Sequence, residues 1–381
     1  MATTSRQIYS IVNTVAQQAM GQSALAVVDN SSLIAMGNTV LGNATTMNNF
    51  ITALTDRIGR TIVSYRAYHN HFPDFERDSM EWGQILQKLK SAMPSAEADQ
   101  AYDLADGKSV DMYTVNKPKT VQNLFTSQTP WQLHVTIHDW MLEDAFTSTE
   151  KMGSFISSIF GEVQNAIELE TETMAMDAVN NYIAELHGTT REVKLLTLYK
   201  DAGGTDYTTN PLLALNDSAF LTFFVKTFNK ISLTMERMLY GRYNTVGADP
   251  NKAMTRHTPK DMQRCLLNID MVNALKTDIY SKAYNKNETT LDLDFKCVPF
   301  WQNPDSNMGI NVKKASNSMV TAVANVVGIL FDREAMGTFK NRFRTSTTPI
   351  NSAGMYYNVY YHMIKMYFND LSENAVTFVL A

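Results

Sequence analysis

A single long helical pattern in the middle of the chain limits most strongly what the chain can fold into. It opens with the capping-box pattern Thr147-Ser-Thr-Glu150, in which Thr147 accepts from the first turn and Glu150 reaches back. Gly188 lies where the C-terminal glycine of a helix is expected. Between these ends, apolar side chains repeat at helical spacing: Met152, Phe155, Ile156, Ile159, Phe160, Val163, Ala166, Ile167, Met174, Ala178 and Ile183. Roughly forty residues at about 1.5 Å each give a rod of roughly 60 Å, far longer than an ordinary globular helix.

Two shorter helices and an extended arm are predicted before this rod. The first helix covers Arg6 to Met20, and a second begins near Thr46. Their apolar stripes are Ile8, Ile11, Val12 and Val15 in the first helix, and Met47, Phe50, Ile51, Leu54 and Ile58 in the second. Residues 21–45, between them, are rich in Gly, Ser, Asn and Thr, which favour turns and loops. We therefore expect an extended arm there.

The stretch from about residue 65 to residue 147 shows no sustained helical stripe. A strand-like piece covers residues 85–93, and Leu133, Val135 and Ile137 alternate with polar residues in a second strand. About forty polar residues lie between the two strands, a length unusual for a loop inside a compact domain. The pattern predicts a long projecting hairpin. In the later half of the rod, Glu168, Glu170 and Glu172, with polar Asn180 and Asn181 beyond them, predict a face that stays wet.

The remainder of the chain mixes helices and strands without a regular alternation. A helix is predicted from Asp217 to Gly241, with Phe220, Phe224, Phe228, Ile231, Met235 and Leu239 on one face. A buried strand at 265–267, a helix at 271–284 and a strand at 291–298 follow. Strands are then predicted at 326–331, 338–344, 355–368 and 375–380. This order favours the α+β class over a doubly wound sheet.

Composition excludes several classes of protein. With 44% hydrophobic and 10% aromatic residues, wholesale disorder is excluded. Only Cys265 and Cys297 are present, too few for a disulfide scaffold. The formal net charge of −5 argues against tight wrapping of nucleic acid, which needs clustered Lys and Arg. The sequence contains no run of 18 apolar residues that could span a bilayer. The segment after Met1 lacks the pattern of a secretory signal.

Candidate motifs for catalysis or ligand binding are weak. The run from Gly37 to Gly42 lacks the lysine of a phosphate-binding loop. His134 and His138 are four residues apart on a predicted strand, roughly 13 Å, which is too far to share one metal ion. A solvated strand face is the better interpretation. His69 and His71 lie in an irregular aromatic stretch and are predicted to have no metal or catalytic role.

Two charged clusters are also ambiguous. Glu168, Glu170 and Glu172 fan around a helix, so we expect a solvated face, or a face that meets basic residues of a neighbour. On a strand, Lys340, Arg342 and Arg344 share one face, which could meet phosphate or an acidic neighbour, or remain a solvated edge. No catalytic, cofactor-binding or metal-binding residue is therefore predicted.

The order of these elements resembles that of the major capsid proteins of tailed bacteriophages, the Hong Kong 97 type of shell subunit. The local sequences that carry the resemblance are Thr147–Gly153 and Tyr182–Leu186 for the spine helix, Gly328–Met336 for a late axial strand and turn, and Tyr356–His362 with Leu371–Val376 for the closing strands. The resemblance covers most of the chain, with the elements in the same order.

This resemblance implies an α+β, Hong Kong 97-like fold and a division of the chain. Residues 1–64 would form the N-terminal arm and helices, 65–146 the extended loop (E-loop), 147–216 the spine helix and the start of the peripheral domain, 217–350 mainly the axial domain, and 351–381 the closing strands. The implied function is structural and not enzymatic: hexamers and pentamers of an icosahedral or prolate head around double-stranded DNA, with no cofactor and no membrane contact.

Partners follow from the same resemblance. They are other copies of the chain, a portal, decoration proteins, and DNA held by non-specific contact, with assembly in the host bacterial cytoplasm. Because the arm starts within about twenty residues of Met1, we expect a separate scaffolding protein. Some relatives cross-link a loop lysine to an asparagine. No motif marks such a pair among Lys88, Lys90, Lys108, Lys117 and Lys119, so we expect no cross-link.

Two alternatives remain open at this point. One is an encapsulin-like shell protein of the same fold that encloses an enzyme. The other is a soluble α+β enzyme whose site has no readable motif. Closed shells in electron microscopy favour either shell protein, and packaged DNA separates the phage subunit from the nanocompartment.

Overall fold

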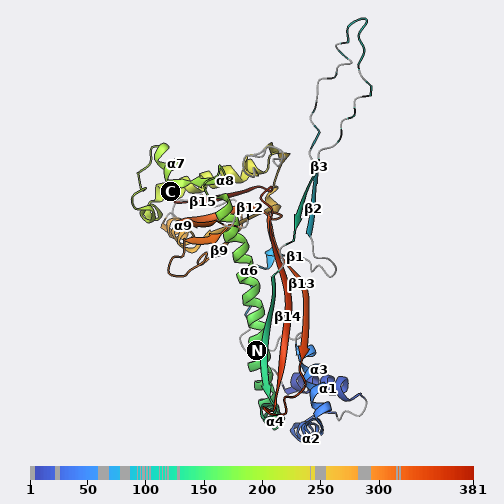
Figure 1. Ribbon diagram of the computed structural model, residues 1–381. Helices are drawn as coiled ribbons and strands as arrows, with labels where there is room; N and C mark the ends of the chain where they lie inside the picture. Colours follow the sequence, from blue (N-terminus) through green and yellow to red (C-terminus); the bar gives the residue numbers. More distant parts are fainter. Residues whose placement is uncertain are drawn as a thin grey trace. The chain divides into compact units, whose positions relative to one another are not determined.

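The computed structural model describes residues 5–21, 26–58, 68–77, 86–91, 93–94, 96, 99, 102, 104–110, 112–113, 115, 117, 120–126, 129–240, 242–244, 255–281, 293–314, 316 and 319–381. The chain divides into two compact units (Figure 1). The first unit contains residues 1–83, 127–175 and 338–367, and the second contains residues 84–126, 176–337 and 368–381.

The first unit is organised on a four-stranded sheet with the order β1-β13-β14-β4. The strands are β1 (Glu76–Arg77), β4 (Thr129–His138), β13 (Met336–Thr347) and β14 (Tyr356–Asn369). β14 and β4 pair antiparallel over ten residues, from Tyr356 opposite His138 to Lys365 opposite Thr129. The inward face carries Ile137, Tyr357, Val359, Tyr361 and Met363, which join the core of this unit.

Helices of the first unit complete that core. They are α1 (Ser5–Met20), α2 (Asn30–Leu41), α3 (Ala44–Ile58), the 3₁₀ turn η2 (Pro73–Phe75), α4 (Asp139–Ala145) and α5 (Thr149–Phe155). The predicted helices at 6–20 and from residue 46 are confirmed as α1 and α3. The side chain of Ile58 lies outside the described part. α4 was missed, because its seven residues are too few to show a helical repeat.

The prediction of an extended arm at residues 21–45 is wrong, because α2 lies inside it. The side chain of Asp29 caps this helix by accepting from the backbone N–H of Ser32. In turn, the hydroxyl of Ser32 accepts from the backbone N–H of Asp29. Leu33, Met36, Gly37 and Val40 are buried on one stripe. A Cβ atom at Gly37 would lie 2.6 Å from the Cβ of Phe146, so glycine allows the close approach.

The long rod exists, with a different start and an internal irregularity. Ser148, and not Thr147, is the N-cap: its side chain accepts from the backbone N–H of Lys151. α5 is followed by a π-helical segment, η4 (Ile156–Gly161), and then by α6 (Glu162–Leu186), which runs from the first unit into the second. Gly188 has a φ of 75°, as a C-terminal glycine requires.

The second unit contains a five-stranded sheet with the order β5-β15-β12-β8-β9. The strands are β5 (Glu192–Lys194), β8 (Gln263–Asn268), β9 (Phe295–Val298), β12 (Val326–Asp332) and β15 (Ala375–Val379). α8 (Ser218–Met235) and α9 (Ile269–Ser281) pack on it, and their apolar side chains share one core with Leu267, Leu330 and Phe378. The strands predicted at 326–331 and 375–380, and the helix within 271–284, are confirmed.

Smaller elements surround this sheet. They are α7 (Leu195–Asp201), the 3₁₀ turns η5 (Pro211–Asn216) and η6 (Lys260–Met262), and the two-stranded pairs β6 (Leu239–Tyr240) with β7 (Thr255–Arg256) and β10 (Ile310–Lys313) with β11 (Val320–Val323). The predicted helix from Asp217 ends at Met235 and not at Gly241, because Leu239 already belongs to β6. Its phenylalanine stripe is buried as predicted.

The predicted hairpin exists, but its return strand was wrongly assigned. β2 (Leu86–Ser91) pairs antiparallel with β3 (Thr120–Phe125), whereas the strand at residues 133–137 is part of β4 and pairs with β14 (Figure 1). The alternation of β4 identified it as a strand, but alternation does not name a partner. We call residues 86–125 the hairpin below.

The prediction of a wet face near the end of the rod is also wrong. Asn180 and Asn181 are buried. Their side-chain amides donate to the carbonyl oxygens of Trp301 (2.8 Å) and Lys313 (3.0 Å). Buried amides of this kind satisfy the hydrogen-bonding needs of loop carbonyl groups and fix the loops to the helix. No helix formed by the described residues is both long and apolar enough to cross a membrane.

Candidate functional site

The root of the hairpin has an inverted pattern of burial. Along β2, Leu89 is 68% exposed while its neighbour Lys90 is 4% exposed. On β3, Leu124 is also exposed, and Asn123, opposite Lys88, is half-buried. An exposed leucine beside a buried lysine is the reverse of what burial of apolar area favours. The buried charge must therefore have partners that hold it.

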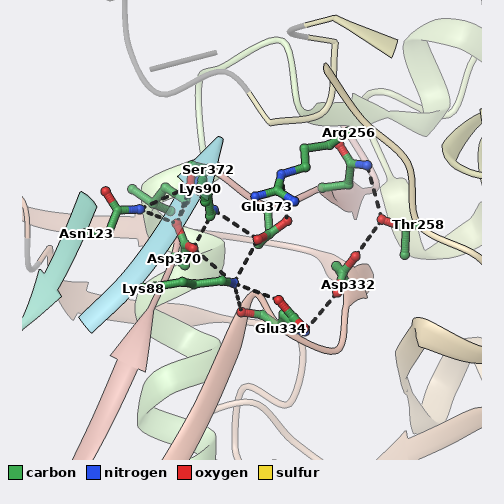
Figure 2. A network of polar contacts seen from close by, with 12 residues as sticks. Lys88, Lys90, Asn123, Arg256, Thr258, Asp332, Glu334, Asp370, Ser372 and Glu373 are labelled. Atoms are coloured by element: carbon green, nitrogen blue, oxygen red, sulfur yellow. Dashed lines mark hydrogen bonds and ion pairs between the residues drawn. The ribbon is translucent and has the colours of Figure 1, made fainter. Parts of the chain in front are cut away.

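Lys90 is held by the segment that joins β14 to β15. Its Nζ lies 2.7 Å from Oδ2 of Asp370 and 2.9 Å from Oε1 of Glu373, and it also donates to the hydroxyl of Ser372. The side chains of Lys90, Asp370 and Glu373 are 2%, 1% and 5% exposed. Asn123 of β3 donates to Oδ1 of Asp370 over 3.1 Å. Both strands of the hairpin are thus tied to one short segment (Figure 2).

Lys88 enters the same group of carboxylates from the next inward position of β2. Its Nζ lies 2.7 Å from Oε1 of Glu373 and 3.2 Å from Oδ2 of Asp370. It also reaches Glu334, at 3.1 Å from the carboxylate Oε2 and 3.1 Å from the backbone oxygen. We call Lys88, Lys90, Asp370 and Glu373 the root cluster. Its two positive and two negative charges balance, which is the condition for burying charged groups.

Neighbouring polar residues fix the carboxylate side of the root cluster. The hydroxyl of Thr258 donates to Oδ2 of Asp332 over 2.7 Å, and the backbone N–H of Glu334 donates to Oδ1 of Asp332 over 2.8 Å (Figure 2). Burial raises the pKa of Asp332, and these two hydrogen bonds offset part of the effect. The turn that presents Glu334 to Lys88 is therefore itself anchored. Arg256 approaches Glu373 from the rim at 3.9 Å.

Arg191 braces the segment that carries the two carboxylates. Its guanidinium is buried and donates to the backbone oxygens of Leu371 (2.7 Å), Glu373 (2.7 Å) and Ala375 (3.0 Å). It also donates to the hydroxyl of Tyr182 on α6 over 3.1 Å and lies over that ring at 5.8 Å. A planar guanidinium can satisfy several fixed acceptors at once. Arg191 therefore shapes the loop on which Asp370 and Glu373 stand.

The electrostatics of the root cluster favour the charged forms of Lys88, Asp370 and Glu373. Burial raises the pKa of Asp370 and of Glu373, but the attraction of Lys90 and Lys88 outweighs it, so both pKa values are lower than usual. For Lys88, burial lowers the pKa, but the attraction of Glu373 and Asp370 outweighs it and the pKa is raised. This arrangement is suited to holding two pieces of chain together.

We expect the root cluster to weaken in acid. Asp370 and Glu373 have folded-state pKa values below the unfolded values of about 3.9 and about 4.3. Their contribution to the free energy of unfolding is therefore full above those unfolded values and is lost as the pH falls through the lowered folded-state values. Urea unfolding of unassembled subunits measured from about pH 6 to about pH 3 checks this. Asp370→Asn should show a smaller acid loss, and equal losses in both proteins would contradict the expectation.

The glutamates of the rod do not behave as a solvated face. Glu172 accepts from the hydroxyl of Tyr68 over 2.7 Å and lies 3.0 Å from Nδ1 of His71, and Glu168 accepts from the backbone N–H of Asn70 over 3.3 Å. Burial raises the pKa of Glu172, but the hydrogen bonds from Tyr68 and His71 outweigh it and the pKa is lowered. Two of the three glutamates thus fix residues 68–71, and only the third is exposed.

The other candidate residues stay apart. His134 and His138 lie on the outward face of β4, as predicted for a strand. Cys265 is buried and Cys297 is exposed, both as free thiols, and burial raises the pKa of each. Arg344 is exposed on β13, while the side chains of Lys340 and Arg342 lie outside the described part. Within the residues that the structure describes, no group of three or more His, Cys, Asp and Glu could hold a metal ion.

Sequence reasoning missed Asp370, Glu373 and Arg191, and it treated Lys88 and Lys90 only as loop lysines. One signal was available: Lys88 and Lys90 are two residues apart on a predicted strand, so they share a face. The carboxylates that pair with them are more than 240 residues away in sequence, and nothing local connects the two segments.

A comparison with protein families decides the identity of the chain. The model of the Phi29-like phage major capsid protein family matches residues 10–379. The chain belongs to this family. Among its relatives, the major capsid protein of Bacillus phage PZA is 25% identical over 379 residues, which is 97% of this chain and 72% of the relative. That of Bacillus phage B103 is 24% identical over the same shares of the two chains.

Solved structures show the fold of this phage capsid protein. A chain in the capsid structure of Staphylococcus phage Andhra matches with a TM-score of 0.57 and 11% identity, over 84% of this chain and 87% of that one. A chain in the structure of the head fiber and inner core protein gp22 of native bacteriophage P68 matches with a TM-score of 0.55, 12% identity and the same coverage. The predicted α+β, Hong Kong 97-like fold is confirmed. The chain is a structural shell subunit of a phage capsid. The comparisons support this function over the nanocompartment and enzyme alternatives.

Proposed function

We propose that this capsid protein forms hexamers and pentamers that close an icosahedral or prolate head around double-stranded DNA, with each hairpin lying on a neighbouring copy. The observation that carries the proposal is the apolar surface of the hairpin. Exposed large apolar side chains follow one another along it: Leu89, Met93, Tyr102, Leu104, Val110, Met112, Tyr113, Val115 and Leu124. Single exposed apolar residues are ordinary, but a succession of them on one segment marks an interaction surface.

The root cluster gives this surface a fixed base. A hairpin of two short strands is marginally stable alone in water, and the buried ion pairs of Lys88 and Lys90 attach it to the second unit. A firmly attached base and an apolar outer part are what a segment needs to join one subunit to another, because less freedom is lost when a pre-ordered element binds.

The division into parts is proposed along the same lines. Residues 1–64 form the N-terminal arm and helices. Within residues 65–146 the hairpin forms the extended loop, because β4 and α4 belong to the first unit. Residues 147–216 form the spine helix and the start of the peripheral domain. Residues 217–350 form mainly the axial domain, and 351–381 the closing strands. We further propose assembly in the bacterial cytoplasm with a separate scaffolding protein, a portal and decoration proteins, without catalysis. The net charge of −5 suits a wall that encloses DNA without gripping it.

Replacing the outer apolar side chains of the hairpin should stop shell formation. We expect a variant with Tyr102→Ser, Met112→Ser and Val115→Ser to give folded subunits but at least about tenfold fewer closed shells, because tyrosine is among the side chains that dominate interface energy and methionine is enriched at interfaces. Negative-stain electron microscopy of the full chain, expressed with its scaffolding protein, counts the shells. The matched control is Lys108→Ser with Lys117→Ser, which changes polar residues of the same segment. Normal shell numbers in the apolar variant would rule out the proposed role.

A further inference from the structure

The outer face of α8 carries a stripe of cationic side chains around one leucine. Lys226, Lys230, Leu233 and Arg237 are all exposed, and their spacing of four, three and four residues places them on one side of the helix. We call these four residues the basic stripe. Together with Asn229 and Thr234 they line a hollow of about 560 Å³, and none of the residues that line it is acidic.

The stability of α8 does not by itself account for the basic stripe. Cations stabilise the C-terminal end of a helix, but this effect is confined to the last turn. Lys226 and Lys230 lie nine and five residues before Met235, the last residue of α8, and like charges four residues apart repel each other. Leu233, at the centre of the stripe, is 51% exposed. DNA phosphates would pair with the lysines and leave the leucine unmatched, so the stripe favours a protein partner that brings both carboxylates and an apolar side chain.

The first part of α6 carries a stripe of the complementary kind. Glu162, Leu169 and Glu170 are exposed, and at about 100° per residue they lie within about 100° of one another around the helix. Leu169 is 54% exposed. The amide of Asn165 contacts Glu162 over 3.5 Å, and the other two glutamates of this helix hold residues 68–71 as described above. We call Glu162, Leu169 and Glu170 the acidic stripe.

The spacing of charge and leucine is the same in the two stripes. Lys226 precedes Leu233 by seven residues and Glu162 precedes Leu169 by seven residues, which is about 10.5 Å along each helix. When the two helices lie parallel with their leucines in contact, the lysine and the glutamate therefore face each other. An antiparallel arrangement would instead place Glu162 opposite Tyr240 and lose the pair.

We propose that α8 of one subunit packs parallel to α6 of a second copy of this chain, with Leu233 against Leu169. In this register Glu170 lies between Lys230 and Arg237 of the facing helix. The inference rests on the proposed function, since it names two surfaces by which neighbouring subunits of the shell meet. Every copy carries one basic and one acidic stripe, so the contact joins different surfaces of identical chains, and contacts of that kind can close into rings such as capsomers.

A charge exchange tests the pairing in shells of the full chain, expressed with its scaffolding protein. Lys226→Glu places a carboxylate opposite Glu162, and like charges across an interface oppose association, so the yield of closed shells should fall by at least about tenfold. Glu162→Lys should have the same effect. The variant with both substitutions should recover the yield, because the pair forms again with its signs reversed. Melting temperatures of the unassembled subunits show whether each variant folds.

Two results of the charge exchange would overturn the contact. One is a normal shell yield in either single variant. The other is a loss in both single variants without recovery in the double variant, which would mean that the two stripes meet other partners, such as packaged DNA or the scaffolding protein.

Thiol cross-linking measures the same contact with all charges unchanged. Subunits with Leu233→Cys and subunits with Leu169→Cys, both also carrying Cys297→Ser to remove the exposed native thiol, are assembled together and treated with 1,2-bis(maleimido)ethane. We expect dimers that contain one subunit of each kind, identified by mass spectrometry of their peptides. Met319→Cys, at another exposed apolar position, replaces Leu169→Cys in the matched control and should give at least about tenfold fewer dimers.

Equal yields of dimers from the two pairings would show that α8 does not lie on α6 of a neighbour, even if a charge variant failed to fold. Failure of the unchanged chain to form shells at all is a different result. It would overturn the proposed function, and this contact with it.

Discussion

Lys90→Met is expected to lower the free energy of unfolding of the second unit by about 3–5 kcal/mol. The substitution keeps an unbranched side chain of similar length but removes the ammonium group that lies 2.7 Å from Asp370 and 2.9 Å from Glu373. Both carboxylates then stay buried with less compensating charge, since Lys88 alone must serve them. Urea unfolding of unassembled subunits measures the loss, and hydrogen exchange of the amides of β2 and β3 shows whether the hairpin detaches first.

The matched control for this substitution is Lys108→Met in the same hairpin. Lys108 is exposed, so its replacement should change the free energy of unfolding by no more than about 0.5 kcal/mol. Adding Asp370→Asn to Lys90→Met should recover part of the loss, because it removes the charge of one of the two buried carboxylates that Lys88 alone would otherwise balance. If Lys90→Met and Lys108→Met have the same effect, the root cluster does not hold the hairpin.

The parts of the fold that sequence reasoning predicted correctly are those with a strong local repeat. The phenylalanine stripe of α8, the alternation of β4 and the apolar stripe of the rod each follow from burial of one face. α2 was missed because its composition of Asn, Ser, Thr and Gly favours turns. Its apolar positions and the Asp29 cap outweigh that preference in the folded chain.

The root cluster was beyond sequence reasoning for a different reason. Lys90 follows an apolar–polar alternation that would place it in solvent, with Leu89 inside, yet the structure has the opposite arrangement. Because side chains alternate along a strand, a one-residue shift in register exchanges its two faces. In β2, the ion pairs of Lys90 with Asp370 and Glu373 select the arrangement in which the lysine is buried and the leucine exposed. Only knowledge of the tertiary fold supplies those partners. The same holds for Asn180 and Asn181, whose buried amides serve loop carbonyls far away in sequence.

Arg191→Lys is expected to destabilise the second unit by about 3 kcal/mol, although it conserves the charge. Arg191 serves four acceptors: the backbone oxygens of residues 371, 373 and 375, and the hydroxyl of Tyr182. An ammonium has three donors on a flexible stem and cannot reproduce the fork of a guanidinium, so buried acceptors are left unsatisfied. Thermal and urea unfolding measure the effect. The control is Arg237→Lys, at an exposed arginine of the same unit, which should leave the free energy of unfolding nearly unchanged.

Because Arg191 positions the segment that carries Asp370 and Glu373, its substitution should also weaken the grip on Lys90. In a double-mutant cycle, Arg191→Lys and Lys90→Met should therefore be non-additive by about 0.5–3 kcal/mol. Once the segment is displaced, less is left for the second substitution to remove, so the double variant should lose less than the two single losses together. Strict additivity would mean that the guanidinium supports the core of the second unit without shaping the anchor of the hairpin.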